Sequence, residues 1–400
     1  MDLNINFAGV PFENPFTVAA SPSSDSREKV RRALEAGWGG IVFKTTALPQ
    51  HSPKLAEPNM AGLSYAGKPQ FAFYNIDLIS ERTVEEIQED IAYFKQLYPD
   101  RRFIGSIMAA GEDEWIELVH RLEEAGADMI ECSMSCPQGE HSIADEGKKA
   151  SNAIPAADRE LMRTTTQTIL RARKKNTPVI VKMTPNVTDL VDVARGAVEG
   201  GADALCCIDT VRGFIGIDLE TGYPKLNVNG LSTWGGLSGP AVKPIALGCV
   251  SKLTKELDIP VAGVGGVSNW QDAAEFLLLG ARNVQVCTAI SRYGFGMVQS
   301  MQKGLLRYME QKGFTSLDAM VGKSLPYLVD HSELSRDNHL HCSIDETACL
   351  KCGSCATACQ DAGFGALHHE KGSVPTLDKA VCRGCGVCQS VCPRDCITLR

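Results

Sequence analysis

Eight short apolar runs recur between Phe16 and Ala289, and stretches with a helical period of polar and apolar residues separate most of them. The runs are almost continuously apolar, as expected of strands that are covered on both faces. Such runs alternating with helices predict a parallel sheet with crossover connections. The eight runs begin at Phe16, Gly39, Phe103, Asp128, Val179, Ala204, Val261 and Asn283.

Amphipathic helices are predicted at 112–125, 157–173, 190–200 and 270–280. Phrases such as EAGW, EAGAD and EGGAD place a glycine at a helix end just before the next strand, which is a termination signal. Eight strand–helix units predict an α/β fold of the (β/α)8 TIM-barrel type. A doubly wound sheet is the alternative for the pattern alone, but it usually has fewer strands. The opening LNINFAGVPFENP predicts a hairpin that closes the bottom of the barrel.

Two cysteine runs near the C-terminus, CLKCGSCATAC and CRGCGVCQSVCP, share the spacing C-x2-C-x2-C-x3-C. This spacing holds a cubane [4Fe–4S] cluster, and in a two-cluster ferredoxin the fourth cysteine of each run ligates the other cluster. A lone CxxC is compatible with zinc or a redox disulfide, but eight cysteines in this order favour two clusters. The first cysteine set is then Cys349, Cys352, Cys355 and Cys392, and the second cysteine set is Cys359, Cys382, Cys385 and Cys388.

The runs also suggest the domain boundaries. We expect a barrel over residues 1–325, a linker over 326–344 and a ferredoxin-like domain over 345–400. Cys249, Cys342 and Cys396 lie outside the cluster runs and are expected to be structural.

Charge and cysteine usage narrow the cellular setting. A formal net charge of −8 at pH 7 argues against nucleic acid or an anionic membrane as a partner. The sequence has no apolar run of spanning length and no secretory pattern at its start. Of the sixteen cysteines, half have cluster spacing and most others lie in apolar strand-like runs, so a reducing compartment, the cytoplasm, is expected.

Catalytic groups of a TIM barrel lie at the carboxyl ends of its strands. Lys44 and Lys182 occupy such ends, and buried lysines are costly unless they meet an anion or an electron-rich ligand. The alternative is that each lysine merely extends to the rim. Gly265 and Gly266 follow the seventh strand and precede a helix, an arrangement that suits a phosphate group.

A flavin would link the clusters to an organic substrate, because it passes electrons singly and transfers hydride. No GxGxxG motif follows a strand, so no FAD or NAD(H) site is predicted in this chain. FMN on the barrel's phosphate site is therefore the expected cofactor, with the glycine-rich loop at 234–240 closing over it.

Three segments then carry a family resemblance: SMSCPQG at 133–139, KMTPNVTDL at 182–190 and GLSGPAVKPIAL at 236–247. With the order barrel-then-ferredoxin, they resemble dihydropyrimidine dehydrogenases, in particular the FMN- and iron–sulfur-carrying subunit of the bacterial NAD-dependent enzymes. The barrel alone resembles class 1 dihydroorotate dehydrogenases. The resemblance implies that electrons pass from NADH through an FAD-binding iron–sulfur partner subunit and the clusters to FMN. The product would be the 5,6-dihydro form of uracil or thymine, in a reversible reaction of a hetero-oligomer.

The resemblance also implies individual roles. Cys136 would be the general acid that exchanges a proton with substrate C5, since a thiol with a pKa of about 8.5 is mostly protonated at neutral pH. The alternatives are that Cys136 is a small buried residue like Cys132, and that His141, in a polar loop predicted to be a lid, donates the proton. The implied FMN contacts are Ala19, Ala20, Lys44, Thr45, Lys182, Ser238, Gly239, Gly265, Gly266, Cys287 and Thr288.

The substrate contacts depart from the family pattern. Asn75 and Thr210 match it, but Ser133 and Asp209 stand where the family has asparagine. An asparagine amide both donates and accepts, whereas an ionised carboxylate only accepts. Either Asp209 is protonated, or the substrate offers more donors than uracil does.

Three functions stay open at this stage. The first is reduction of a C=C bond in a pyrimidine or another unsaturated cyclic amide. The second is a dihydroorotate dehydrogenase-like oxidase, against which the two clusters on the same chain argue. The third is a non-catalytic electron-transfer module, for which Cys136 and the strand-end lysines would be unnecessary.

Overall fold

The computed structural model describes residues 2–65, 68–134, 158–337 and 340–400. The chain divides into two compact units, Met1–Tyr327 and Leu328–Arg400. Within the described ranges, no helix is both long and apolar enough to cross a membrane.

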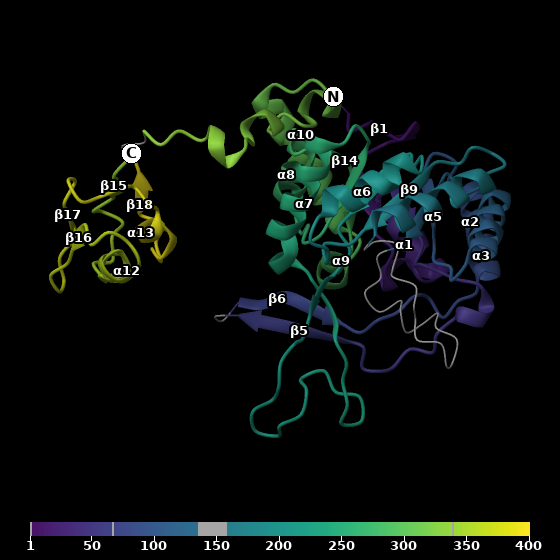
Figure 1. Cartoon of the computed structure of the whole chain (residues 1–400), viewed down its shortest axis with the longest axis horizontal. Helices are drawn as coiled ribbons and strands as arrows, with labels where there is room; N and C mark the ends of the chain where they lie inside the picture. Colours follow the sequence, from purple (N-terminus) through teal and green to yellow (C-terminus); the bar gives the residue numbers. More distant parts are fainter. Residues whose placement is uncertain (1, 66–67, 135–157, 338–339) are drawn as a thin grey trace. The chain divides into compact units, whose positions relative to one another are not determined.

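The first unit is a closed parallel barrel, and all eight predicted strands form it. Nearly all of their residues are buried. Helices cover the outside of the barrel (Figure 1), and side chains fill the inside of such a barrel. The predicted TIM barrel is therefore confirmed. In barrel order the strands are β3 (Phe16–Val18), β4 (Gly40–Val42), β7 (Arg102–Ile107), β8 (Met129–Ser133), β9 (Val179–Met183), β10 (Ala204–Cys207), β13 (Val261–Val264) and β14 (Ala281–Val286).

Amphipathic helices surround the barrel, and the four predicted ones correspond to α3, α5, α6 and α8. Side-chain caps begin several of them: Asp158 accepts from the Leu161 amide at the start of α5, and Asn269 from the Asp272 amide at the start of α8. Among the residues described for this unit, the α-helices are α1 (Arg27–Ala36), α2 (Val84–Leu97), α3 (Glu112–Ala125), α5 (Arg159–Ala172), α6 (Leu190–Glu199), α7 (Lys243–Glu256), α8 (Trp270–Leu278), α9 (Thr288–Tyr293), α10 (Met297–Lys312) and α11 (Leu317–Met320).

The predicted N-terminal hairpin consists of β1 (Ile5–Phe7) and β2 (Val10–Phe12). It lies against the beginnings of the barrel strands: the Arg102 side chain donates to the Pro11 carbonyl at 2.6 Å, and Arg282 donates to the Asn6 carbonyl at 3.3 Å. The hairpin closes the end of the barrel away from the strand carboxyl ends.

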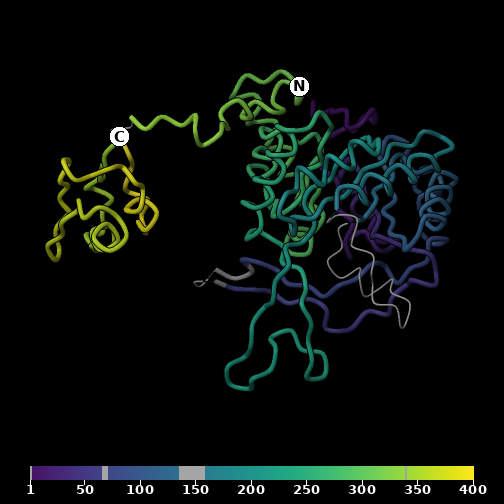
Figure 2. The backbone as a smooth tube through the Cα atoms, in the orientation of Figure 1, coloured from purple at the N-terminus to yellow at the C-terminus, as the bar shows by residue number. Residues whose placement is uncertain are grey.

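A second sheet, which the sequence analysis did not predict, lies at the opposite end. It contains β5 (Met60–Tyr65), β6 (Lys68–Asn75), β11 (Val211–Gly213) and β12 (Gly235–Ser238) in the order β11-β12-β6-β5. Figure 2 shows the connection between β11 and β12 projecting away from the barrel as a long teal loop. The sheet places β6 and β12 beside the barrel mouth.

The second unit is built from two similar halves. The first half contains β15 (Cys342–Ile344), α12 (Ser354–Ala362) and β16 (Leu367–His368); the second contains β17 (Thr376–Leu377), α13 (Val387–Ser390) and β18 (Ile397–Leu399). β15 pairs with β18, and β16 pairs with β17. Because β15 pairs inside this unit, the unit includes part of the segment expected to be a linker.

Candidate active site

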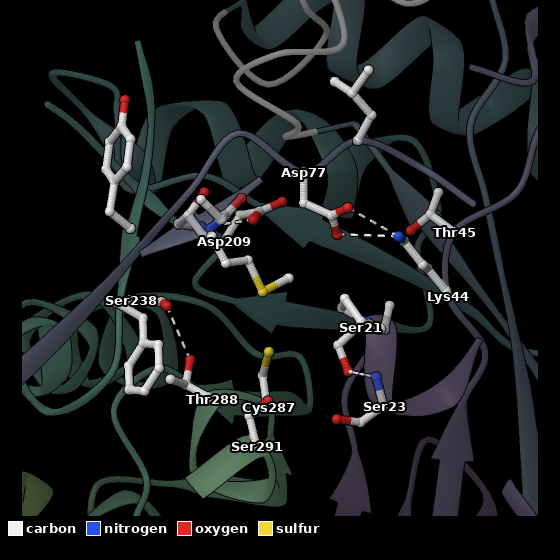
Figure 3. A pocket seen from close by; sticks show the side chains of 18 of the residues that line it. Ser21, Ser23, Lys44, Thr45, Asp77, Asp209, Ser238, Cys287, Thr288 and Ser291 are labelled. Atoms are coloured by element: carbon white, nitrogen blue, oxygen red, sulfur yellow. Dashed lines mark hydrogen bonds and ion pairs between the residues drawn. The ribbon is translucent and has the colours of Figure 1, made fainter. Parts of the chain in front are cut away.

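A cavity of about 290 Å³ opens at the carboxyl ends of the barrel strands (Figure 3). It gathers most of the predicted site residues, namely Ala20, Lys44, Thr45, Asn75, Ser133, Lys182, Asp209, Thr210, Ser238, Cys287 and Thr288. Ala19, Gly239, Gly265 and Gly266 are not part of its wall. Cys136, His141 and the predicted lid lie outside the described residues.

Lys44 is buried between two carboxylates just beyond the end of β4. Its ammonium lies 3.1 Å from Asp77 and 3.9 Å from Asp25, and Figure 3 shows Lys44 and Asp77 directed toward one another. Ser80 donates a short hydrogen bond to Asp25. Burial raises the pKa of Asp77, and attraction to Lys44 offsets part of the shift. The two carboxylates therefore fix the position of a buried positive charge in the cavity wall.

Lys182 belongs to a second buried charged group, inside the barrel. Its ammonium lies 3.4 Å from Glu131, which is fully buried, and Gln285 donates to the other Glu131 oxygen at 2.9 Å. Burial alone would lower the pKa of Lys182, but attraction to Glu131 and to further groups, Asp209 among them, together outweighs burial and the pKa is raised. Lys182 therefore stays positively charged at the floor of the cavity.

Three elements meet at the polar side of the cavity. Asn75, the last residue of β6, donates to the Gly236 carbonyl at 3.2 Å. A side chain at Gly236 would collide with Thr210, so β12 lies directly against that hydroxyl-bearing residue. The Asp209 carboxylate accepts from the Thr210 amide at 2.6 Å. The four predicted substrate-binding residues, Ser133 included, thus line one cavity.

A hydroxyl contact joins the last residue of β12 to the segment that follows β14. Thr288 donates to Ser238 at 3.0 Å, and Cys287 projects into the cavity between these residues and Lys44 (Figure 3). Burial raises the pKa of the Cys287 thiol, and Lys182 offsets part of the shift. This side of the cavity therefore presents neutral donors.

Gly265 and Gly266 follow β13 in backbone conformations that disfavour a side chain, with φ of +128° and +76°. A Cβ at Gly265 would lie 2.8 Å from the Ala246 Cβ, and one at Gly266 would lie 2.7 Å from the Lys243 Cβ. The Gly265–Gly266 loop is thus pressed against the first turns of α7. This helix follows Ser238 and Gly239 in the chain. The segments that follow β12, β13 and β14 converge here.

The second unit contains two cavities, and the eight cluster cysteines are divided between them. One is lined by the whole first cysteine set, and the other by the whole second cysteine set. No three side chains of the described residues are placed to hold one metal ion. A cubane does not require that, because each of its four irons takes one thiolate. The donor chemistry of both cavities fits a [4Fe–4S] cluster.

Each unit of the chain matches the model of a known protein family or domain. Residues 2–309 match the dihydroorotate dehydrogenase family model, and residues 342–399 match the 4Fe-4S dicluster domain. The chain belongs to the dihydroorotate dehydrogenase family. It is an oxidoreductase, and the family resemblance seen in the sequence is confirmed.

Individual relatives extend over most of the chain. The NAD-dependent dihydropyrimidine dehydrogenase subunit PreA of Escherichia coli K12 is 38% identical, covering all of this chain and 95% of the relative. The chloroplastic dihydropyrimidine dehydrogenase (NADP(+)) of Arabidopsis thaliana is 33% identical over 83% of this chain and 79% of its own length. The catalytic subunit of dihydroorotate dehydrogenase B (NAD(+)) of Pyrococcus abyssi is 33% identical over 81% and 99%, respectively.

The family binds FMN, and the residues of this barrel fit that group. A phosphate needs bare backbone N–H groups and hydroxyl donors, which the tight Gly265–Gly266 loop and the Ser238–Thr288 pair offer. A flavin ring that gains negative charge needs fixed cations, which Lys44 and Lys182 offer.

Replacing Gly266 with alanine is expected to weaken FMN binding about tenfold or more, because the new Cβ would displace the backbone at the start of α7. Gly222→Ala is the matched control: Gly222 has a similar φ of +74°, but its Cβ would meet no atom within 4 Å. FMN dissociation constants of the two variants, measured by flavin fluorescence, test this. Equal FMN affinities of the two variants would show that crowding at α7 does not affect FMN binding.

Sequence reasoning missed several residues of the cavity. The β5–β6 hairpin contributes Met60, Ala61, Gly62 and Phe73 to the wall, and the loop after it contributes Asp77. The short run FAFY, rich in aromatic residues, was the available signal for β6. No local signal identifies Asp77 or Glu131 as partners of the lysines, because those contacts join distant segments.

Proposed function

We propose that this family member reduces the C5–C6 double bond of a pyrimidine base such as uracil or thymine. Electrons would come from NADH through an FAD-carrying partner subunit and the two clusters. Two relatives named as dihydropyrimidine dehydrogenases support this choice, and the PreA relative, named as a subunit, supports a partner. The proposed setting is the cytoplasm.

The observation that carries the proposal is the composition of one cavity wall. That wall brings together one amide, two hydroxyl groups, one carboxylate and two buried ammonium groups. They belong, in that order, to Asn75, Thr210 and Ser133, Asp209, and Lys44 and Lys182. A pyrimidine edge alternates carbonyl oxygens and N–H groups, so it needs both donors and acceptors. The same chain carries two cavities that each contain one set of four cluster cysteines, and two clusters there would supply a route for single electrons.

The chain's own residues have separable tasks in this proposal. When bound, FMN supplies the exchange between single electrons and a two-electron reduction of a double bond. Lys44 and Lys182 stabilise negative charge on a group bound in the cavity, and Asp77, Asp25 and Glu131 keep them in place.

The substrate's own atoms are handled by other residues. Asn75 and Thr210 orient the pyrimidine, and Cys136 delivers the proton to C5. In the sequence, Cys136 comes three residues after Ser133, the last residue of β8.

A second candidate is the same reduction on an unsaturated cyclic amide with more hydrogen-bond donors than uracil. Asp209 favours it, because its carboxylate lies in the cavity wall. The family pattern of the dihydropyrimidine dehydrogenases has asparagine at this position. A carboxylate facing a substrate carbonyl leaves a buried polar group mismatched, at a cost of about 1–3 kcal/mol.

The test is a reduction assay with the anaerobically purified chain. Its flavin is released and identified, and reduced viologen is the electron donor for uracil, thymine, orotate and other unsaturated lactams. Uracil or thymine should be reduced fastest. Preference for orotate would support a dihydroorotate dehydrogenase-like oxidase, and no reduction of any substrate would support an electron-transfer module. NADH alone should not bleach the flavin, because no dinucleotide motif follows a strand.

Restoring both asparagines, by Asp209→Asn with Ser133→Asn, is expected to raise kcat/KM for uracil about tenfold relative to the unmodified chain. Each matched hydrogen bond contributes about 1 kcal/mol, and asparagine adds the donor that a carboxylate lacks. Asp337→Asn, an exposed site outside the cavity, is the control. If the double variant reduces uracil more slowly than the unmodified chain, Asp209 does not oppose a substrate carbonyl.

A further inference from the structure

Each cluster cavity of the second unit has a fifth cysteine in its wall. Cys396 lines the cavity of the first cysteine set, and Cys342 lines the cavity of the second. Both are buried, at 8% and 7% exposure. The spacing rule uses neither residue, so both thiols lie beside a cluster without a place in it.

Thiol contacts bring the two additional cysteines to particular ligands. The Cys396 sulfur lies 3.4 Å from the Cys392 sulfur, and Cys349 packs against the same buried cluster of side chains as Cys396. Cys342 and Cys388 line the same cavity and are both buried in that cluster of side chains. Neither contacts Cys352 or Cys385 in any hydrogen bond described for these residues, and those two ligands are the exposed ones.

The repeat within the unit shows that packing does not require sulfur at these places. Cys396 precedes β18 as Ala366 precedes β16 in the other half, and Ala366 lines the second cavity. Similarly, Cys342 lies two residues before Ile344, the end of β15, and Pro375 lies two residues before Leu377, the end of β17. Pro375 lines the first cavity. An apolar residue fills the corresponding position in each case.

We propose that Cys396 and Cys342 are reserve ligands of the two [4Fe–4S] clusters. When Cys349 or Cys392 is lost, Cys396 gives up its proton to solvent and forms the Fe–S bond that the lost ligand made. Cys342 does the same for Cys388. The exchange breaks one Fe–S bond and forms another, and it requires no oxidant or reductant because the irons keep their charge.

The experiment compares iron and acid-labile sulfide in anaerobically purified full-length variants. Cys349→Ala should keep about eight irons per chain, the content of two cubanes, with a changed electron paramagnetic resonance spectrum after reduction. Cys349→Ala with Cys396→Ala should keep about four. Cys396→Ala alone should keep about eight, with an unchanged spectrum, because alanine is the residue of the corresponding position.

Cys352→Ala is the matched control, since no reserve thiol contacts Cys352, and it should keep about four irons. The second cavity repeats the design with Cys388→Ala, Cys388→Ala with Cys342→Ala, and Cys385→Ala as the control. Flavin content of every variant reports that the barrel is intact, so loss of iron is not loss of the whole fold.

Several outcomes would overturn the proposal. In Cys349→Ala, about seven irons would mean a three-iron cluster with an unfilled position, and about four would mean a lost cluster. Retention of eight irons in the Cys349–Cys396 double variant, or in Cys352→Ala, would mean that another group fills the position. Loss of a cluster in Cys396→Ala alone would mean that the cluster needs Cys396 even when all four of its ligands are present.

Discussion

Replacing Lys182 with methionine is expected to destabilise the barrel by about 3–5 kcal/mol, because it leaves the Glu131 carboxylate buried without its cation. Glu131 is fully buried, and only Gln285 would remain as its partner among the contacts described here. Denaturant unfolding of the anaerobic chain, followed by circular dichroism, measures the loss.

Two further variants make this result specific. Glu131→Gln in the Lys182→Met background should recover much of the stability, because no unpaired charge then remains in the barrel. Arg31→Met breaks an ion pair with Glu35 in which both side chains are about half exposed, and such pairs contribute less than about 1 kcal/mol. If Lys182→Met costs no more than Arg31→Met, the buried pair does not hold the barrel together.

The second large effect is expected at Cys136. Cys136→Ala should lower turnover by about 10²–10⁴-fold, the usual contribution of a general acid, while FMN and both clusters remain bound. Stopped-flow reduction of the flavin by viologen should be unchanged, and only the step that consumes substrate should slow.

Cys132→Ala, four residues earlier, is the control for this variant. Cys132 is fully buried in β8, and burial raises the pKa of its thiol far above the usual range, so turnover per flavin-loaded chain should not change. Near-native turnover in Cys136→Ala would transfer the role of acid to another group, and His141→Ala would then be the next variant to measure.

The barrel was predictable because its strands and helices have local signals. Eight buried runs and helix-ending glycines repeat along the chain, and the closed barrel follows once eight such units exist. The strand-end positions of Lys44 and Lys182 followed from the same register. The ferredoxin cysteines were predictable because their ligand spacing is itself a local pattern.

Contacts between distant segments were not predictable in the same way. Asp77 and Glu131 are ordinary acidic residues in the sequence, and only the fold brings them to Lys44 and Lys182. Cys342 and Cys396 were expected to be structural because they lie outside the cluster spacing, yet the fold places each in the wall of a cluster cavity. The β5–β6 hairpin was missed because its strands are short and show no regular alternation of apolar and polar residues, so a loop interpretation competes with them.

The glycines around the barrel mouth differ in whether they can accept a side chain, and this decides which of them can be varied in protein engineering. Gly235 and Gly236 have no space for a side chain, since the Asn75 carbonyl and the Thr210 side chain occupy it. Gly62, across the same sheet, lines the cavity and has no atom within 4 Å of the place a Cβ would take. A library that varies residue 62 together with Met60 would reshape the entrance for bulkier or smaller ring substituents without disturbing the lysines below.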